Sequence, residues 1–249
     1  ACGEKNILFT NNDTAYETAI SLIQKGIKVQ AIIDNREEID SKLIKETEKN
    51  NIKIYKGYTI VDTFGYKRIN SVSIMKLSKD GQKVIGSKEN ISCDSLGISG
   101  GWTPAVHLFT QSGGKLKFRD DDQVFIPNTY PSNQISIGSC NGDFTLDEIL
   151  INAPKLLKEF LNIKKTEYEN IEIYSAFNKS KRNIWLLPSN KIVGKTKSFV
   201  DFQNDATAKD IKLALREGFR SIEHVKRYTT TGMGTDQGKL GNMHALGII

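Results

Sequence analysis

The sequence predicts an α/β fold with a parallel sheet in its first part, followed by an antiparallel β meander and a small helical module. Three patterns support this prediction. Apolar runs alternate with stretches of helical period up to residue 55, period-two alternation follows up to residue 93, and short capped helices are predicted between residues 207 and 228. Strands separated by helices are typical of parallel sheets with right-handed crossovers.

The parallel part is predicted to contain five elements in strand–helix alternation. They are a buried strand at Ile7–Thr10, a helix from Asp13 to about Lys25, a strand at Val29–Asp34, a more polar helix at Glu37–Asn50 and a strand at Ile52–Tyr55. Apolar positions in the first helix recur every three or four residues, and the polar residues before it can cap its start. This order of elements predicts a Rossmann-like three-layer unit.

The meander is predicted between Thr59 and Cys93, where no helix intervenes. Ser71–Leu77 alternates with period two, and Lys79–Gln82 is typical of a hairpin turn. Two further strands are expected at Ser95–Ser99 and Gln134–Gly138.

Helices are predicted again in the second half of the chain. The capping-box spacing of Thr145 and Glu148 predicts a helix that reaches about Phe160, and Pro154 is expected to kink or break it. Thr207 is expected to cap a helix over 208–217, and another short helix is predicted over 221–228.

Composition narrows the class of protein. The chain has 249 residues, of which 38% are hydrophobic and 26% charged, which is typical of a globular protein. It contains no apolar run of membrane-spanning length and no signal-peptide pattern, so we expect a cytoplasmic location and no membrane contact. The net charge is +6, but the lysines are spread among acidic residues, so we expect no nucleic-acid partner.

Metal binding is not expected from the cysteines and histidines. The three cysteines and three histidines are scattered and form no CxxC pair, which favours reduced structural thiols. The chain has no initiating methionine and closes on the apolar run Ala245–Ile249, so we expect the natural polypeptide to continue beyond both ends.

The turn between the first strand and the first helix reads Thr10-Asn11-Asn12-Asp13-Thr14-Ala15 and contains no glycine. In dinucleotide-binding units this turn reads GxGxxG, which lets the backbone approach a pyrophosphate at the helix N-terminus. Asp13 instead places a negative charge there, although Asp34 ends the second strand where an acid could bind a ribose. The sequence therefore favours a Rossmann-like unit without a tight dinucleotide site.

Two glycine-rich turns follow predicted strands, at Gly100–Pro104 and at Gly138–Asp143. Glycines at such positions allow a ligand to come close, and a helix start offers free N–H donors. The alternative is a pair of ordinary turns with Trp102 as a packing residue, and composition alone favours that alternative.

The stretches Val200–Thr207 and Thr230–Lys239 resemble the small module of bacterioferritin-associated ferredoxin, in which cysteines near a capped helix and a glycine-rich loop hold an iron–sulfur cluster. Asp201 and Gln203 stand at the CxC positions of that module, and Asp236 stands at the next cysteine position. We therefore expect a ferredoxin-like module without an iron–sulfur cluster.

Several long strings in the same order resemble the alpha subunits of heterotetrameric sarcosine oxidases. The matching stretches are Asn11–Tyr16, Ser99–Phe109, Gln111–Leu116 and Phe199–Asn242, the last of which includes Arg216–Ser221 and Lys226–Thr230. In that family one Rossmann-like domain is inserted into another, and a ferredoxin-like module and a folate-binding domain follow. The resemblance implies that residues 1–94 are the inserted domain, 95–162 the returning half of the first dinucleotide-binding domain, 163–198 a linker and 199–249 the helical module.

The resemblance also implies which residues bind and which cofactors take part. It assigns cofactor binding to eight residues of the two glycine-rich turns: Gly100, Gly101, Trp102, Pro104, Gly138, Asn141, Gly142 and Asp143. Arg227, Gly234 and Lys239 become candidates for the subunit interface or for a flavin phosphate. NAD is the implied cofactor of the pocket, which this chain completes only in part, and FMN and FAD are expected on the partner subunit.

The family oxidatively demethylates sarcosine, with flavins of the beta subunit taking the hydride and passing electrons to oxygen. The beta subunit and the smaller subunits are thus the implied partners. We expect no catalytic residue in this chain and no activity of the chain by itself. Two alternatives stay open at this point: a structural module without a ligand, and a fragment of another NAD- or FAD-dependent reductase or amine oxidoreductase.

Overall fold

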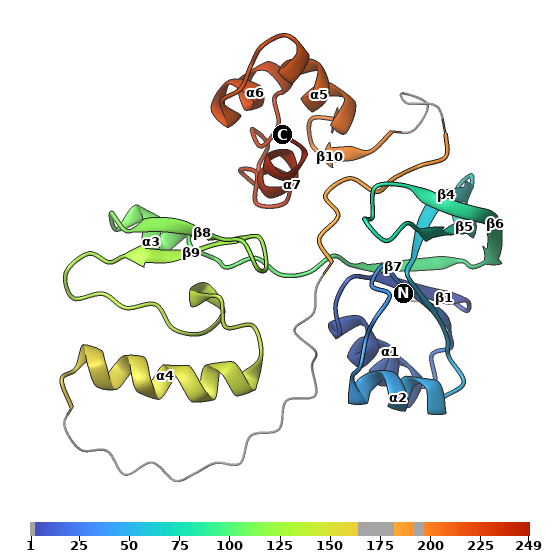
Figure 1. Ribbon diagram of the computed structural model, residues 1–249, viewed down its shortest axis with the longest axis horizontal. Coiled ribbons are helices and arrows are strands. Elements are labelled where there is room, and N and C mark those ends of the chain that lie inside the picture. The colour runs from blue at the N-terminus through green and yellow to red at the C-terminus, as the bar shows by residue number, and fades with distance from the viewer. Residues whose placement is uncertain (1–2, 164–181, 192–196) are drawn as a thin grey trace. The chain divides into compact units, whose positions relative to one another are not determined.

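The computed structural model describes residues 3–163, 182–191 and 197–249, and it confirms an α/β fold with parallel and antiparallel strands (Figure 1). The chain divides into two compact units. One comprises Ala1–Tyr58, Phe64–Val72 and Ile91–Asn183, and the other comprises Thr59–Thr63, Ser73–Asn90 and Ile184–Ile249. Within the described ranges, no helix is long and apolar enough to cross a bilayer.

A four-stranded parallel sheet forms the centre of the first unit, as predicted. Its strands are β1 (Asn6–Thr10), β2 (Val29–Asp34), β3 (Lys53–Lys56) and β7 (Ser95–Ser99), in the order β3-β2-β1-β7. Thr10 at the end of β1 lies opposite Asp34 on one side and opposite Ser99 on the other. The carboxyl ends of three strands therefore meet at one edge of the sheet. β7 lies beyond residue 94. The first strand of the segment 95–162, which is the expected returning half, therefore belongs to this sheet.

Helices α1 (Thr14–Gln24) and α2 (Lys42–Lys49) connect β1 to β2 and β2 to β3. An apolar core lies between them and the sheet, built from Leu8, Ala15, Tyr16, Ala19, Val29, Ile32, Ile44 and Ile52. The predicted start of the second helix at Glu37 was wrong. Ser41 has extended backbone angles, and the Arg36 carbonyl accepts a hydrogen bond from the Gly57 N–H at 2.8 Å, so a loop precedes α2.

The predicted meander is present as a three-stranded sheet in the order β4-β5-β6. Its strands are β4 (Tyr58–Gly65), β5 (Ile69–Leu77) and β6 (Val84–Ser92). Neighbouring strands joined by turns this short pair antiparallel. The turn after β5 is closed by the Ser78 N–H, which donates to the Lys83 carbonyl at 2.9 Å.

The rest of the first unit contains a hairpin that the sequence patterns had not predicted. After α3 (His107–Gln111), β8 (Lys115–Arg119) and β9 (Val124–Thr129) pair antiparallel, and the 3-10 helix η1 (Gly138–Asn141) precedes α4 (Leu146–Phe160). The strand predicted at Gln134–Gly138 was wrong. Ile137 is extended, but a strand also needs a hydrogen-bonded neighbour, and none is found within the described residues. α4 continues through Pro154.

The C-terminal module is helical, as expected. A short ribbon of β10 (Phe199–Asp201) and β11 (Ala206–Thr207) leads into α5 (Ala208–Arg216), which is followed by α6 (Ile222–Thr229) and α7 (Gly241–Ile248). Its core consists of Val200, Ala208, Ile211, Ala214, Val225 and Ala245. The predicted cap is present, since the Thr207 N–H donates to the Asp210 carboxylate at 2.8 Å.

The expected linker at 163–198 is described only in part, because residues 164–181 and 192–196 lie outside the described ranges. Leu186 packs against the core of the C-terminal module. The Trp185 ring meets the His244 ring edge-on, with centroids 5.7 Å apart. This part of the expected linker is therefore packed on the module.

Candidate functional site

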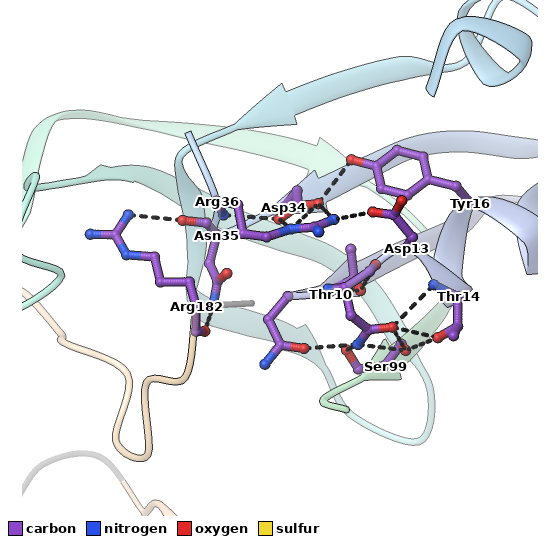
Figure 2. Close-up of polar contacts among 11 residues, drawn as sticks. Thr10, Asp13, Thr14, Tyr16, Asp34, Asn35, Arg36, Ser99 and Arg182 are labelled. Carbon is purple, nitrogen blue, oxygen red and sulfur yellow. Dashed lines mark hydrogen bonds and ion pairs between the residues drawn. The ribbon is translucent and has the colours of Figure 1, made fainter. Parts of the chain in front are cut away.

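The turn that follows β1 lies at the carboxyl edge of the parallel sheet, where open α/β sheets usually bind ligands (Figure 2). Asn12 closes this turn: its Oδ1 accepts hydrogen bonds from the Thr14 N–H at 3.1 Å and from the Thr14 hydroxyl. Its Nδ2 donates to the Ser99 carbonyl at 3.2 Å. A first-turn N–H of α1 that would otherwise face a phosphate is thus bound by an asparagine side chain.

A buried ion network lies beside this turn. Arg36 donates to Asp13 through Nη2 at 2.9 Å and to Asp34 through Nη2 at 2.7 Å and Nε at 3.1 Å. The side chains of all three residues are at most 2% exposed. Two buried carboxylates therefore share one buried guanidinium, next to the N-terminus of α1, whose dipole favours negative charge.

Tyr16 belongs to the same network, since its hydroxyl donates to Asp34 Oδ2 at 2.9 Å. Burial raises the pKa of Tyr16 far above its usual range, and the charge of Asp34 adds to this effect. Burial acts to lower the pKa of Arg36, but its hydrogen bonds to Asp34 and Asp13 and their charges outweigh that effect and raise it. Tyr16 therefore stays protonated and Arg36 stays charged near neutral pH.

These contacts give the Asp13 and Asp34 carboxylates partners inside the protein. A pyrophosphate at this turn would meet the Asp13 charge, and a ribose would compete with Arg36 and Tyr16 for Asp34. The geometry thus favours the expectation that this turn lacks a tight dinucleotide site, which stays a prediction. Sequence reasoning missed Arg36, although an arginine two residues after a strand-ending acid was a usable signal.

The first glycine-rich turn directly follows β7. Gly101 has a φ of 106°, a left-handed conformation suited to glycine, and a Cβ there would lie 3.7 Å from Asn11 Oδ1. Trp102 is 62% exposed, so it is not a packing residue within the described parts of the chain. Pro104 is buried. The predicted residues of this turn thus lie next to the end of β1.

The second glycine-rich turn comprises η1 and the residues that lead into α4. Gly138 and Gly142 are left-handed, with φ of 76° and 87°. Asp143 is 9% exposed, and its Oδ1 accepts from the Asn152 side chain at 2.9 Å. Its Oδ2 is buried and has no hydrogen-bond partner among the described residues. Asn141 accepts at Oδ1 from the Tyr130 hydroxyl at 3.2 Å.

Arg119 of β8 fixes this turn from the side. Its Nη2 donates to the Gly142 carbonyl at 3.0 Å, and its Nε donates to Asp122 at 2.8 Å. The hydrogen bond to Asp122 and the nearby carboxylates raise the pKa of Arg119 against the effect of burial. A Cβ on Gly142 would lie 2.8 Å from Arg119 Nη2, and the φ of 87° would strain any other residue, so both features favour glycine there. The structure thus places Gly138, Asn141, Gly142 and Asp143 in one rigid turn.

The C-terminal module replaces the expected cluster ligands with polar side chains that bind backbone. Asp201 accepts from the N–H groups of Gly232 at 2.7 Å and Gln203 at 2.8 Å. Gln203 Oε1 accepts from the Thr235 N–H at 2.6 Å, and Asp236 Oδ1 accepts from the Gly238 N–H at 3.2 Å. Asp201 and Gln203 thus join their own segment to the loop at 232–235, whereas Asp236 binds within its own loop. No group of histidine, cysteine and carboxylate residues within the described ranges is arranged to hold a metal ion.

The predicted interface residues lie on this module. Gly234 lies in the loop between α6 and α7, and a Cβ there would come within 2.4 Å of Gln203 Oε1. Lys239 follows in the same loop, and Arg227 lies on α6. Three apolar side chains of the same module are exposed, namely Phe202 (74%), Met233 (53%) and Leu240 (70%).

Sequence comparison finds similarity to sarcosine oxidase alpha subunits along the whole chain. Residues 195–249 match the sarcosine oxidase A3 domain. The whole chain is 32% identical to the sarcosine oxidase subunit alpha of Rhizobium meliloti (strain 1021), and 99% of it is 29% identical to that of Corynebacterium sp. (strain P-1). The chain spans 24% and 26% of these relatives, or about a quarter of their length.

Two solved structures resemble the chain more distantly. The thioredoxin reductase of T. acidophilum is 17% identical, with a TM-score of 0.49 over 65% of this chain and 53% of that one. A bacillithiol disulfide reductase of Staphylococcus aureus is 13% identical, with a TM-score of 0.39 over 64% of this chain and 52% of that one. In sequence, the chain is similar along its whole length to a segment that makes up about a quarter of the sarcosine oxidase alpha subunit of Rhizobium meliloti, and residues 195–249 match the sarcosine oxidase A3 domain.

Proposed function

We propose that the chain is part of a sarcosine oxidase alpha subunit, in which it contributes to an NAD pocket and to docking with a flavin-bearing beta subunit during oxidative demethylation of sarcosine. Its whole-length similarity to such subunits supports this proposal. Residues 1–94, 95–162, 163–198 and 199–249 are the proposed inserted domain, returning half, linker and docking module. The chain supplies binding surfaces, and the flavin chemistry belongs to the partner.

One observation carries the pocket proposal: Asp143 Oδ2 is buried without a hydrogen-bond partner. A buried carboxylate oxygen is costly unless a donor reaches it, so an unpaired one indicates a missing partner. A nucleotide ribose supplies hydroxyl donors of the required kind. The left-handed glycines at the start of η1 and directly after it would let the backbone approach the nucleotide closely.

The test compares NAD binding by assembled enzyme that carries Asp143→Asn with that of the unchanged protein. Asparagine keeps an oxygen for Asn152 but turns an N–H toward the ribose in place of an acceptor. Because a hydrogen bond to a charged group contributes about 1.5–3 kcal/mol, we expect NAD affinity to fall roughly 10- to 100-fold. The exposed Asp121→Asn is the matched control. Equal affinity of the Asp143 variant and the control would contradict the pocket.

The docking proposal is carried by the apolar side chains around the loop that contains Gly234 and Lys239. Phe202, Met233 and Leu240 are all more than half exposed, which is unusual for a loop that only contacts water. Exposed aromatic and methionine side chains beside basic residues are typical of a protein interface. We therefore propose the beta subunit as the occupant, with Arg227 or Lys239 available to a flavin phosphate.

Co-expression of the alpha subunit with its beta partner tests the docking role. Gly234→Val should disrupt assembly, because its side chain would collide with Gln203. Lys239→Glu introduces no such collision and should lower assembly or FMN content, whereas the exposed Lys209→Glu on α5 serves as the control. Unchanged assembly and FMN content in both loop variants would favour a module that is structural only.

A further inference from the structure

Arg182 lies against the carboxyl end of β2 (Figure 2). Asn183 lies against the carboxyl end of β1. The Asn35 side chain donates to the Arg182 carbonyl at 3.1 Å, and Arg182 Nη1 donates back to the Asn35 carbonyl at 2.9 Å. Asn11 Nδ2 donates to Asn183 Oδ1 at 3.4 Å. These two residues, which we call the strap, therefore bind the residue that follows each strand.

The strap lies at a particular place in the fold. The sheet order β3-β2-β1-β7 reverses direction at β1, because the chain moves outward to β3 and then returns to the other side of β1. Ligands of open parallel sheets bind outside the carboxyl ends of the strands at such a reversal. The strap thus lies where a nucleotide would lie in a Rossmann-like unit.

Its contacts also extend to the hairpin of the same unit. Asn183 Nδ2 donates to the Asp122 carbonyl at 3.1 Å, in the turn between β8 and β9. Asn35 is 4% exposed, and its Oδ1 has no partner within the described ranges, so Nδ2 holds its side chain to the strap. Asn183 thus contributes two side-chain hydrogen bonds to the contact and Asn35 contributes one.

We propose that Arg182 and Asn183 are the resident occupant of this ligand edge, so that the N-terminal sheet binds its own chain where related folds hold a nucleotide. The network around Asp13 and Arg36 fills the phosphate side of the edge, and the strap fills the side next to β2. This goes beyond the proposed NAD pocket, which comprises the two glycine-rich turns Gly100–Pro104 and Gly138–Asp143. Because the strap occupies the ligand edge of the N-terminal sheet, one dinucleotide is bound, at the proposed NAD pocket, and a second is not bound at this edge.

An arginine-specific protease tests the strap in the assembled enzyme. Arg182 is the only arginine between Arg119 and Arg216, so cleavage there gives a fragment that begins at Asn183 and is identified by mass spectrometry. Because the Arg182 side chain is bound to Asn35, cleavage should be slow in the unchanged protein. Cleavage at the exposed Arg216 serves as the internal reference, since global unfolding would accelerate both cuts.

Two variants should release the strap. Each hydrogen bond contributes about 1 kcal/mol, and cleavage follows the open population, so we expect roughly fivefold faster cleavage with Asn35→Ala and tenfold or more with Asn183→Ala. Asn50→Ala, whose side chain donates only within α2, is the control and should change nothing. Unchanged cleavage at Arg182 in both strap variants would overturn the proposal.

A second arm adds saturating NAD to the unchanged enzyme. A resident strap predicts a rate of cleavage at Arg182 that does not rise with NAD. A rate that rises with NAD would show that nucleotide displaces the strap, which would overturn the proposal. The Asp143 variant tests the NAD pocket separately, so failure of the pocket and failure of the strap give different results.

Discussion

Replacement of Arg36 by methionine tests whether the buried ion network stabilises the first unit. The change keeps most of the side-chain length but removes the guanidinium that holds Asp13 at 2.9 Å and Asp34 at 2.7 and 3.1 Å. Both carboxylates are almost completely buried, so neither can turn to water without opening the structure. Removing one partner of a buried ion pair costs about 3–5 kcal/mol, and here both carboxylates lose the charge that compensates them.

Urea unfolding followed by circular dichroism measures this loss. Lys45→Met is the matched control, since the Lys45–Asp40 pair at 3.4 Å has side chains that are 70% and 88% exposed and should contribute below about 0.5 kcal/mol. A loss below about 1 kcal/mol at pH 7 would refute the reasoning, as would a loss equal to the control's.

Three further predictions concern the C-terminal module. Asp201→Asn should cost about 1–3 kcal/mol at pH 7, because its amide N–H would face the Gly232 N–H. Burial opposes ionisation of Asp201, but hydrogen bonds from backbone N–H groups lower the pKa of Asp201. The stability that ionised Asp201 contributes is therefore present above the unfolded pKa of about 3.9 and is lost as pH falls through the lower folded pKa. An acid titration in which the stabilities of wild type and variant run parallel would contradict this. Trp185→Ala should lower the melting temperature, because it removes a ring contact with His244 of α7. The exposed Trp102→Ala should leave the melting temperature unchanged. Equal shifts of the melting temperature in calorimetry would argue against packing at Trp185. Metal analysis after anaerobic reconstitution should find no stoichiometric iron and sulfide, since no thiolate stands at the cluster positions, and stoichiometric amounts would reverse that conclusion.

The parallel sheet was predictable because each strand is a compact apolar run. Val29–Asp34 and Ser95–Ser99 have the predicted bounds, and the cap at Thr207 follows from local spacing. The hairpin β8–β9 was missed, although Lys115–Arg119 alternates between polar and apolar residues. The strand at Gln134–Gly138 was predicted from the same kind of pattern, which shows that alternation predicts extended backbone and not a pairing partner.

The site was less predictable than the fold because its contacts join distant residues. Asp13 and Asp34 could be placed near each other from the strand order, but their shared guanidinium becomes clear only once the loop after β2 turns Arg36 back over the sheet edge. Asn35 and Arg182 are 147 positions apart, and no local pattern indicates that pair. Asp143 was selected through a resemblance, and its buried unpaired oxygen is visible only in three dimensions.

Photolabelling tests the location of the dinucleotide most directly. Assembled enzyme is irradiated with a photoreactive NAD analogue, with and without excess NAD, and the labelled peptides are identified by mass spectrometry. The proposed pocket predicts NAD-protected label at Gly138–Asp143 or Gly100–Pro104, and none at Thr10–Thr14 or Asp34–Arg36. Protected label confined to the turn after β1 and the end of β2 would contradict both the proposed pocket and the occupied sheet edge.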